Sequence, residues 1–117
     1  MIDLVPGSPA GISVVTADRE DAGFHATKHL LDLGHTAIGF IGDAAARPKT
    51  TLRKMGGYQR ALKAGGVAFE ESYIQNVSEF GFEGGQRGCR KLIERCPTVT
   101  AAFCINDPIA LGTIDAA

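Results

Sequence analysis

The stretch VTAAFCI at positions 99–105, followed by NDP at 106–108, decides the fold. Its first seven residues carry no charge and include β-branched and aromatic side chains, which predicts a short buried strand. Asp107 then suits a helix N-cap, and Pro108 suits the first helical position. A buried strand that leads directly into a helix is the unit from which parallel α/β sheets are built.

The same unit recurs toward the N-terminus. Strands are predicted over 12–16, 37–42 and 73–77, and helices over about 22–33, 52–64, 84–95 and from 107 onward. Residues 1–11, with two prolines and two glycines, predict a loop or a linker. The alternation of strands and helices indicates the α/β class, as a three-layer α/β/α arrangement around a mainly parallel sheet.

Composition narrows the function. The 117 residues carry a formal net charge of −1, which argues against a chain that binds nucleic acid through its overall charge. No apolar run approaches the roughly 20 residues of a membrane span, so no membrane partner is expected. The N-terminus does not resemble a secretory signal, although a mature chain that has lost its signal is an alternative that stays open. Cys89, Cys96 and Cys104 form no CxxC pair, which predicts reduced, buried thiols and a cytoplasmic location.

The motifs of common enzymes are missing. The sequence has no GxSxG, no GxxxxGK[ST] and no GxGxxG, so neither a catalytic residue nor a cofactor is expected. His25 and His29 share a helical face, but no HExxH frame surrounds them, so no metal is expected and a solvent-exposed face is the simpler interpretation. An enzyme on a flavodoxin-like sheet is therefore disfavoured.

Ligands of open parallel sheets bind beyond the carboxyl ends of the strands. This rule selects four segments, namely 17–21, 43–53, 78–82 and 106–107. They hold Asp21, Phe80, Asn106 and Asp107, which combine acceptors, an aromatic face and an amide. That mixture suits a sugar, a nucleobase or a similar polar molecule. Each residue also has a structural interpretation, as a helix acid, a cap or a core aromatic.

A basic run extends from Arg47 to Lys63, with six cations and no acid. One interpretation is a solvent-exposed helix face. The other concerns Arg53 and Lys54, which begin a helix beside the ligand segments and can hold hydroxyls or a carboxylate. No aromatic platform interleaves the run, which argues against nucleic-acid binding.

Four motifs occur in register along the chain. They are Asp21-Ala22-Gly23 followed by HLLDLGH at 29–35, IGFIG at 38–42, GYQRAL at 57–62, and a stretch from Pro97 to Gly112 that contains Asn106-Asp107. Together they resemble the LacI/GalR family of bacterial transcriptional regulators. The resemblance implies a core like that of periplasmic sugar-binding proteins, in which two α/β lobes close on a small effector and thereby control DNA binding.

The same resemblance implies an effector site built from Asp21, Arg53, Lys54, Phe80, Asn106 and Asp107. Family members usually carry an arginine four residues before the tyrosine of the GY motif. Here that position is Lys54, and Arg53 precedes it, so it stays open which of the two contacts the effector.

The family layout implies that residues 1–34 end the first lobe and that residues 35–117 form an incomplete core of the second. No DNA-binding domain is then expected in this chain, and DNA would be contacted only through a helix-turn-helix domain elsewhere. An interrupted sheet exposes strand edges, so we expect a homo-oligomer, including swapped forms. The alternative to a regulator is a secreted periplasmic sugar-binding receptor, which the missing signal and the three cysteines disfavour.

Overall fold

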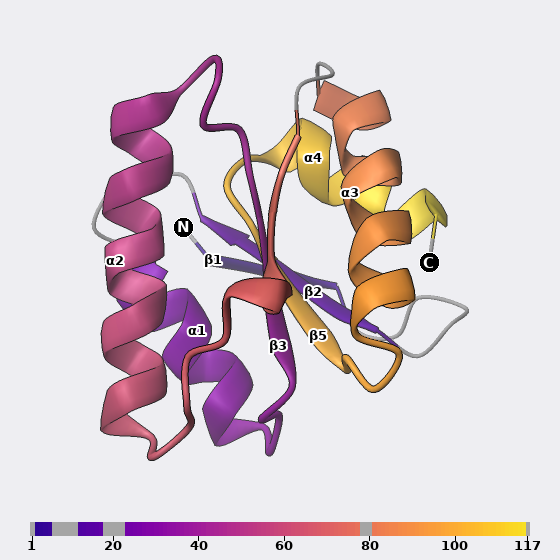
Figure 1. The fold of residues 1–117 in the computed structure, drawn as a ribbon. Helices are drawn as coiled ribbons and strands as arrows, with labels where there is room; N and C mark the ends of the chain where they lie inside the picture. Colours follow the sequence, from indigo (N-terminus) through magenta and orange to yellow (C-terminus); the bar gives the residue numbers. More distant parts are fainter. Residues whose placement is uncertain (1, 6–11, 18–22, 78–80, 117) are drawn as a thin grey trace.

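The computed structural model describes residues 2–5, 12–17, 23–77 and 81–116 (Figure 1). Five strands form one sheet in the order β1-β2-β5-β3-β4. The strands are β1 (Ile2–Val5), β2 (Ser13–Ala17), β3 (Ile38–Gly42), β4 (Ile74–Asn76) and β5 (Ala101–Cys104). The helices are α1 (Gly23–Asp32), α2 (Pro48–Ala64), α3 (Gly81–Arg95) and α4 (Asp107–Ala116), and a 3₁₀ turn covers Glu71–Tyr73.

The sheet is mainly parallel. β2, β5, β3 and β4 run in one direction, and β1 pairs antiparallel with β2. The chain steps one way across the sheet from β2 to β3 and β4, and then steps back to β5. Right-handed crossovers therefore place α1 and α2 on one face and α3 on the other, and Figure 1 shows α4 beside α3. The predicted three-layer α/β class is confirmed.

The structure corrects three details of the prediction. Residues 2–5 form a strand where a loop or linker was expected, because they pair with the outer side of β2. α2 begins at Pro48, one turn before the expected start at 52. Proline is well tolerated there because the first N–H groups of a helix have no partner within it. α3 likewise begins at Gly81 instead of 84.

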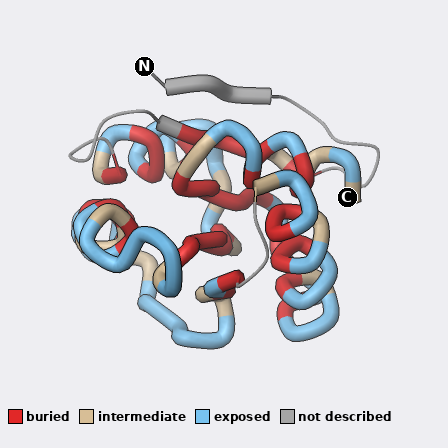
Figure 2. Tube along the Cα trace, turned by 90° about the horizontal axis from the view of Figure 1, so that it is seen from above, coloured by how far each residue is buried: buried red, intermediate tan, exposed pale blue. Residues whose placement is uncertain are grey.

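The core lies between the layers, as Figure 2 shows by the buried positions along the strands and the inner faces of the helices. The rings of Phe40 and Phe103 stack across β3 and β5 with centroids 5.5 Å apart. The hydroxyl of Tyr58 in α2 donates to the Ile38 carbonyl at 2.6 Å. Cys89, Cys96 and Cys104 are free and buried, as predicted.

Glycines let the helices of each layer approach closely. A Cβ on Gly23 of α1 would overlap the backbone of Lys54 in α2, and Gly57 of α2 lies against the backbone of Gly23 and Phe24. In the other layer, Gly85 of α3 faces the Ile109 carbonyl, and Gly112 of α4 faces the Phe82 carbonyl. Both helix pairs therefore pack backbone against backbone.

The lobe boundary near residue 34 stays a prediction. β2 precedes this boundary and β5 follows it, yet the two strands pair along Ser13–Thr16 and Ala101–Cys104 in the same sheet. Among the described residues, no helix has both the length and the apolar character needed to cross a bilayer.

Candidate functional site

The carboxyl ends of four parallel strands meet at one end of the sheet. β2 ends at Ala17, β3 at Gly42, β4 at Asn76 and β5 at Cys104. The described parts of the predicted ligand segments follow directly from these strands. Four of the predicted site residues, Arg53, Lys54, Asn106 and Asp107, can be placed. Asp21 and Phe80 lie outside the described residues.

Lys54 crosses from α2 to the end of β5. Its side chain is 3% exposed, and Nζ donates to the Ile105 carbonyl at 2.6 Å. Burial of an ammonium group is costly unless it is hydrogen-bonded, so this contact holds α2 firmly against the strand. Lys54 directly follows the segment 43–53 and Ile105 directly precedes Asn106, so the bond brings the borders of two predicted site segments together.

Arg53 differs from its neighbour, since its side chain is exposed. The two adjacent cations thus point to different environments, one into the protein and one toward solvent. A guanidinium at the surface offers a planar set of donors that matches a carboxylate or a pair of hydroxyls. The sequence left open which of the two cations contacts the effector. In the structure, Arg53 is accessible from solvent and Lys54 is buried.

Asn106, and not Asp107, caps α4. Asn106 Oδ1 accepts a hydrogen bond from the Ile109 backbone N–H at 3.0 Å, which is the usual link between an N-cap and the third helical residue. Asp107 is the first residue of the helix, and its side chain is exposed. The prediction of Asp107 as the cap is wrong, because Pro108 occupies the second helical position and not the first. The cap uses only the oxygen of Asn106, so its Nδ2 group can donate to a ligand.

Two further polar residues lie at this end of the sheet. Asp43 follows β3 and is 6% exposed, and its carboxylate accepts a hydrogen bond from the Ala46 backbone N–H at 3.3 Å. The Asp43 backbone N–H in turn donates to the hydroxyl of Thr51 at 3.2 Å. Sequence reasoning included their segment but did not single them out. The signal for Asp43 was its position as the first charged residue after an uncharged strand.

The described part of the site holds no reactive thiol. Burial raises the pKa of the Cys104 thiol to about 12 and that of Cys89 to about 11, so both stay protonated and unreactive at neutral pH. His25 and His29 are exposed on α1, and the described part of the chain holds no cluster of three His, Cys, Asp or Glu side chains suited to a metal ion. The arrangement instead suits reversible binding of a polar molecule by hydrogen bonds.

The polar residues of this site lie beyond the carboxyl ends of parallel strands, which is where open α/β sheets bind small molecules. The chain belongs to the periplasmic binding protein-like domain family, which it matches over residues 27–117.

Curated relatives include transcriptional regulators. The chain is 36% identical over 106 residues to catabolite control protein A of Priestia megaterium, which covers 91% of this chain and 32% of that protein. It is 33% identical over 117 residues to the HTH-type transcriptional repressor PurR of Haemophilus influenzae, which covers 99% of this chain and 34% of that protein. The chain therefore spans about a third of the length of these relatives.

Solved structures agree. A sugar-binding LacI-family transcriptional regulator of Escherichia coli, complexed with phosphate, superposes with a TM-score of 0.74 at 30% identity over 83% of this chain and 34% of that chain. The complex of the transcriptional regulator CelR with cellobiose gives a TM-score of 0.76 at 27% identity over 83% of this chain and 29% of that chain. The resemblance to LacI-family regulators that the motifs indicated is confirmed.

Proposed function

We propose that this chain is the effector-sensing part of a bacterial transcriptional regulator and has no catalytic role. A small polar effector, sugar-like or nucleobase-like, binds at the carboxyl end of the sheet and controls the DNA binding of the longer protein. The observation that carries the proposal is the contact between Lys54 and the Ile105 carbonyl, because it joins α2 to the segment of Asn106 at the position where parallel sheets bind ligands. The regulators named among the relatives support this function over a secreted receptor.

Each site residue has a role in this proposal. Arg53 contacts hydroxyls or a carboxylate of the effector, and Asn106 donates through Nδ2. Asp107 and Asp21 accept from effector hydroxyls, and Phe80 stacks on its ring. Lys54 acts as a positioning residue, since its ammonium already bonds Ile105.

Effector binding acts by shifting the balance between open and closed lobes. An effector that binds the closed form more tightly raises its population, and DNA affinity follows if the two forms differ in it. In this scheme residues 1–34 end the first lobe, and residues 35–117 supply the second. DNA is contacted through a helix-turn-helix domain of the kind that the names of relatives record, and the protein works in the cytoplasm.

Thermal denaturation of the full-length regulator against sugars, sugar phosphates and purines tests the effector site. A true effector raises the unfolding midpoint in a concentration-dependent way. At 100 times Kd it adds about 2.7 kcal/mol to the free energy of unfolding. Arg53→Ala and Asn106→Ala should abolish this shift. Lys91→Ala, an exposed change on α3, should preserve it. A panel without any shift, or a shift that all three variants keep, would contradict the site.

The proposal includes a homo-oligomer. β1 and β4 are the outer strands of the sheet, and outer strands carry backbone groups that can pair with another chain. Light scattering of the 117-residue chain should therefore give a mass of a dimer or more. A strictly monomeric, cooperatively folding species would contradict this part.

A further inference from the structure

α2 carries a row of cations along its outer face. Within Pro48–Ala64 the helix has five basic residues and no acid, and four of them are exposed, namely Lys49, Arg53, Arg60 and Lys63. At 3.6 residues per turn these four side chains lie within about 80° of one another around the helix axis. We call this row the basic ridge. Lys54 lies on the buried face and is not part of it.

Of the ridge residues, only Lys63 lies in the last turn of α2, where the helix dipole favours a cation. The first turn of α2 contains Lys49 and no acid, although the helix dipole favours acids there. By contrast, α3 begins with Glu83 in its first turn and ends with Arg95 in its last, as the dipole prefers. The one-sided charge of α2 therefore calls for an explanation outside the helix.

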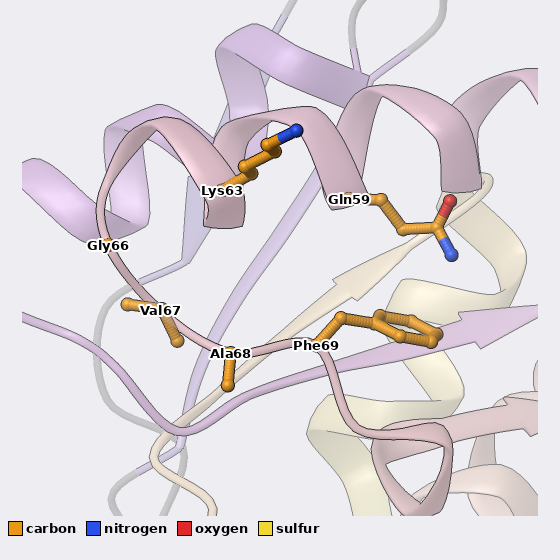
Figure 3. A pocket seen from close by; sticks show the side chains of 6 residues that line it. All are labelled: Gln59, Lys63, Gly66, Val67, Ala68 and Phe69. Atoms are coloured by element: carbon orange, nitrogen blue, oxygen red, sulfur yellow. The ribbon is translucent and has the colours of Figure 1, made fainter.

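An apolar groove borders the ridge. A hollow of about 520 Å³ is lined by Gln59, Lys63, Gly66, Val67, Ala68 and Phe69 (Figure 3). A second hollow, lined by Met55, Gln59, Phe69, Glu71 and Ile74, shares two of these residues. We call the two together the α2 groove. Leu52 lies on the same flank of α2 and is 71% exposed, so it extends the apolar surface beside the groove.

The wall of the groove is preformed. The ring of Phe69 meets Tyr58 edge-on at 6.4 Å, and the Tyr58 hydroxyl is fixed to the Ile38 carbonyl. A partner that fills the groove therefore pays little ordering entropy at Phe69. None of the groove residues belongs to the proposed effector site.

We propose that the basic ridge and the α2 groove form a docking surface for an acidic amphipathic segment of a partner protein. Apolar side chains of the segment enter the groove beside Phe69 and cover Leu52, and its carboxylates lie along Lys49, Arg60 and Lys63. Such segments bind as helices whose apolar face lies in a groove, while flanking charges set orientation and rate of association.

Charge and shape favour this occupant over two others. A second copy docking through the same face would bring two basic ridges together, and like charges at an interface are strongly unfavourable. Nucleic acid would neutralise the ridge through phosphates, but a phosphate backbone supplies no apolar group for Leu52 and the groove. An acidic amphipathic segment satisfies both halves of the surface.

Fluorescence anisotropy tests the proposal with a fluorescein-labelled synthetic peptide that forms an amphipathic helix, with Leu and Phe on one face and a row of Glu beside it. The peptide is titrated with the 117-residue chain. Arg60→Glu/Lys63→Glu should weaken binding at least about tenfold, whereas the matched reversal Arg90→Glu/Lys91→Glu on α3 should change it less than about twofold. Leu52→Ser should weaken it about fivefold, and Leu111→Ser, at another exposed leucine that lies on α4, should not.

Controls separate the occupants. Circular dichroism confirms that each variant keeps its helices. A peptide with Ser in place of Leu and Phe should bind at least about fivefold more weakly, because the groove is then unfilled. Absence of peptide binding at about 1 mM would overturn the proposal. It would also be overturned if duplex DNA bound more tightly than the peptide and ignored Leu52→Ser, since the surface would then serve nucleic acid.

Discussion

The two helical layers are alike where their helices cross. They differ in the side chain that each layer places against the end of β5. In both layers glycines bring the helix backbones together, Gly23 with Gly57 and Gly85 with Gly112. From the α1/α2 layer, the Lys54 ammonium reaches the Ile105 carbonyl. From the α3/α4 layer, the Thr113 hydroxyl lies 3.5 Å from the Cys104 thiol, which donates to it.

This difference separates a contact that serves packing from a contact that contributes to the proposed site. Thr113 and Cys104 are neutral and buried in mid-core, so their contact serves stability. Lys54 is charged, and its bond lies at the carboxyl end of the sheet beside Asn106. The glycine crossings are therefore a shared structural device, whereas the buried cation is particular to the layer that contributes to the proposed site.

The largest expected effect tests the shared device. Gly85→Leu should destabilise the chain by about 3 kcal/mol or more, because a Cβ at this position overlaps the Ile109 carbonyl and forces α3 and α4 apart. Gly23→Leu should cost a similar amount in the other layer. Urea unfolding followed by circular dichroism measures both.

Gly56 provides the control for these two variants. A Cβ at Gly56 meets no atom within 4 Å, so Gly56→Ala should stabilise by about 0.5–1 kcal/mol. If Gly85→Leu or Gly23→Leu kept the wild-type midpoint, backbone contact would not hold that layer together.

The next effect tests the buried cation. Lys54→Ala should cost about 2 kcal/mol, since it leaves a cavity and an unsatisfied Ile105 carbonyl. Arg53→Ala, one residue earlier but exposed, should stay within about 0.5 kcal/mol. Chemical denaturation of the two variants side by side measures the contrast. Equal losses would mean that Lys54 is not the distinguishing feature of its layer.

The third effect concerns pH and the thiols of the α3/α4 side. Burial raises the pKa of Cys104 from 9.0 to about 12 and that of Cys89 to about 11, so the folded chain keeps protons that the unfolded chain releases above pH 9. The contribution of these two thiols to stability is therefore fully present below pH 9 and is lost as the pH rises toward their folded pKa values.

Cys104 should contribute a loss of about 1.4 kcal/mol per pH unit between pH 9 and its folded pKa. Cys89 adds a loss that ends at lower pH, because its pKa is raised less. Urea midpoints measured at pH 8, 9 and 10 should reveal the slope, and Cys104→Ala should flatten it. An unchanged slope in that variant would show that other groups cause the alkaline loss.

Much of the fold could be predicted from the sequence because its central strands are uncharged and end at clear signals. Both strands that stack Phe40 on Phe103 were located, and Gly34, just after α1, has the positive φ that favours glycine. β1 was missed because a four-residue strand next to two prolines has no pattern of its own and forms through pairing with β2. The start of α2 was predicted too late in the sequence, because a proline in a polar stretch is as compatible with a loop as with a first helical turn.

The site was less predictable, although one signal was overlooked. Tyr58 and Leu62 are buried residues of α2, and Lys54 precedes them by four and eight residues. Helical spacing therefore already placed Lys54 on the buried face and Arg53 beside it. The cap of α4 could not be decided from sequence, because both Asn106 and Asp107 are good N-cap residues and only the register of the helix distinguishes them.

The smallest expected effect concerns the uncharged hydrogen bonds of the α3/α4 layer. The Thr113 hydroxyl donates to the Ile109 carbonyl at 2.9 Å, lies 3.3 Å from the Gly85 carbonyl and accepts from Cys104, so Thr113→Val removes these contacts without a large change in shape. The expected cost is about 1 kcal/mol, below that of Lys54→Ala, because neutral hydrogen bonds contribute less than those of a buried charge. A double-mutant cycle with Cys104→Ala isolates the thiol contact, and a coupling below about 0.5 kcal/mol would leave the contacts with the Ile109 and Gly85 carbonyls as the source of the loss.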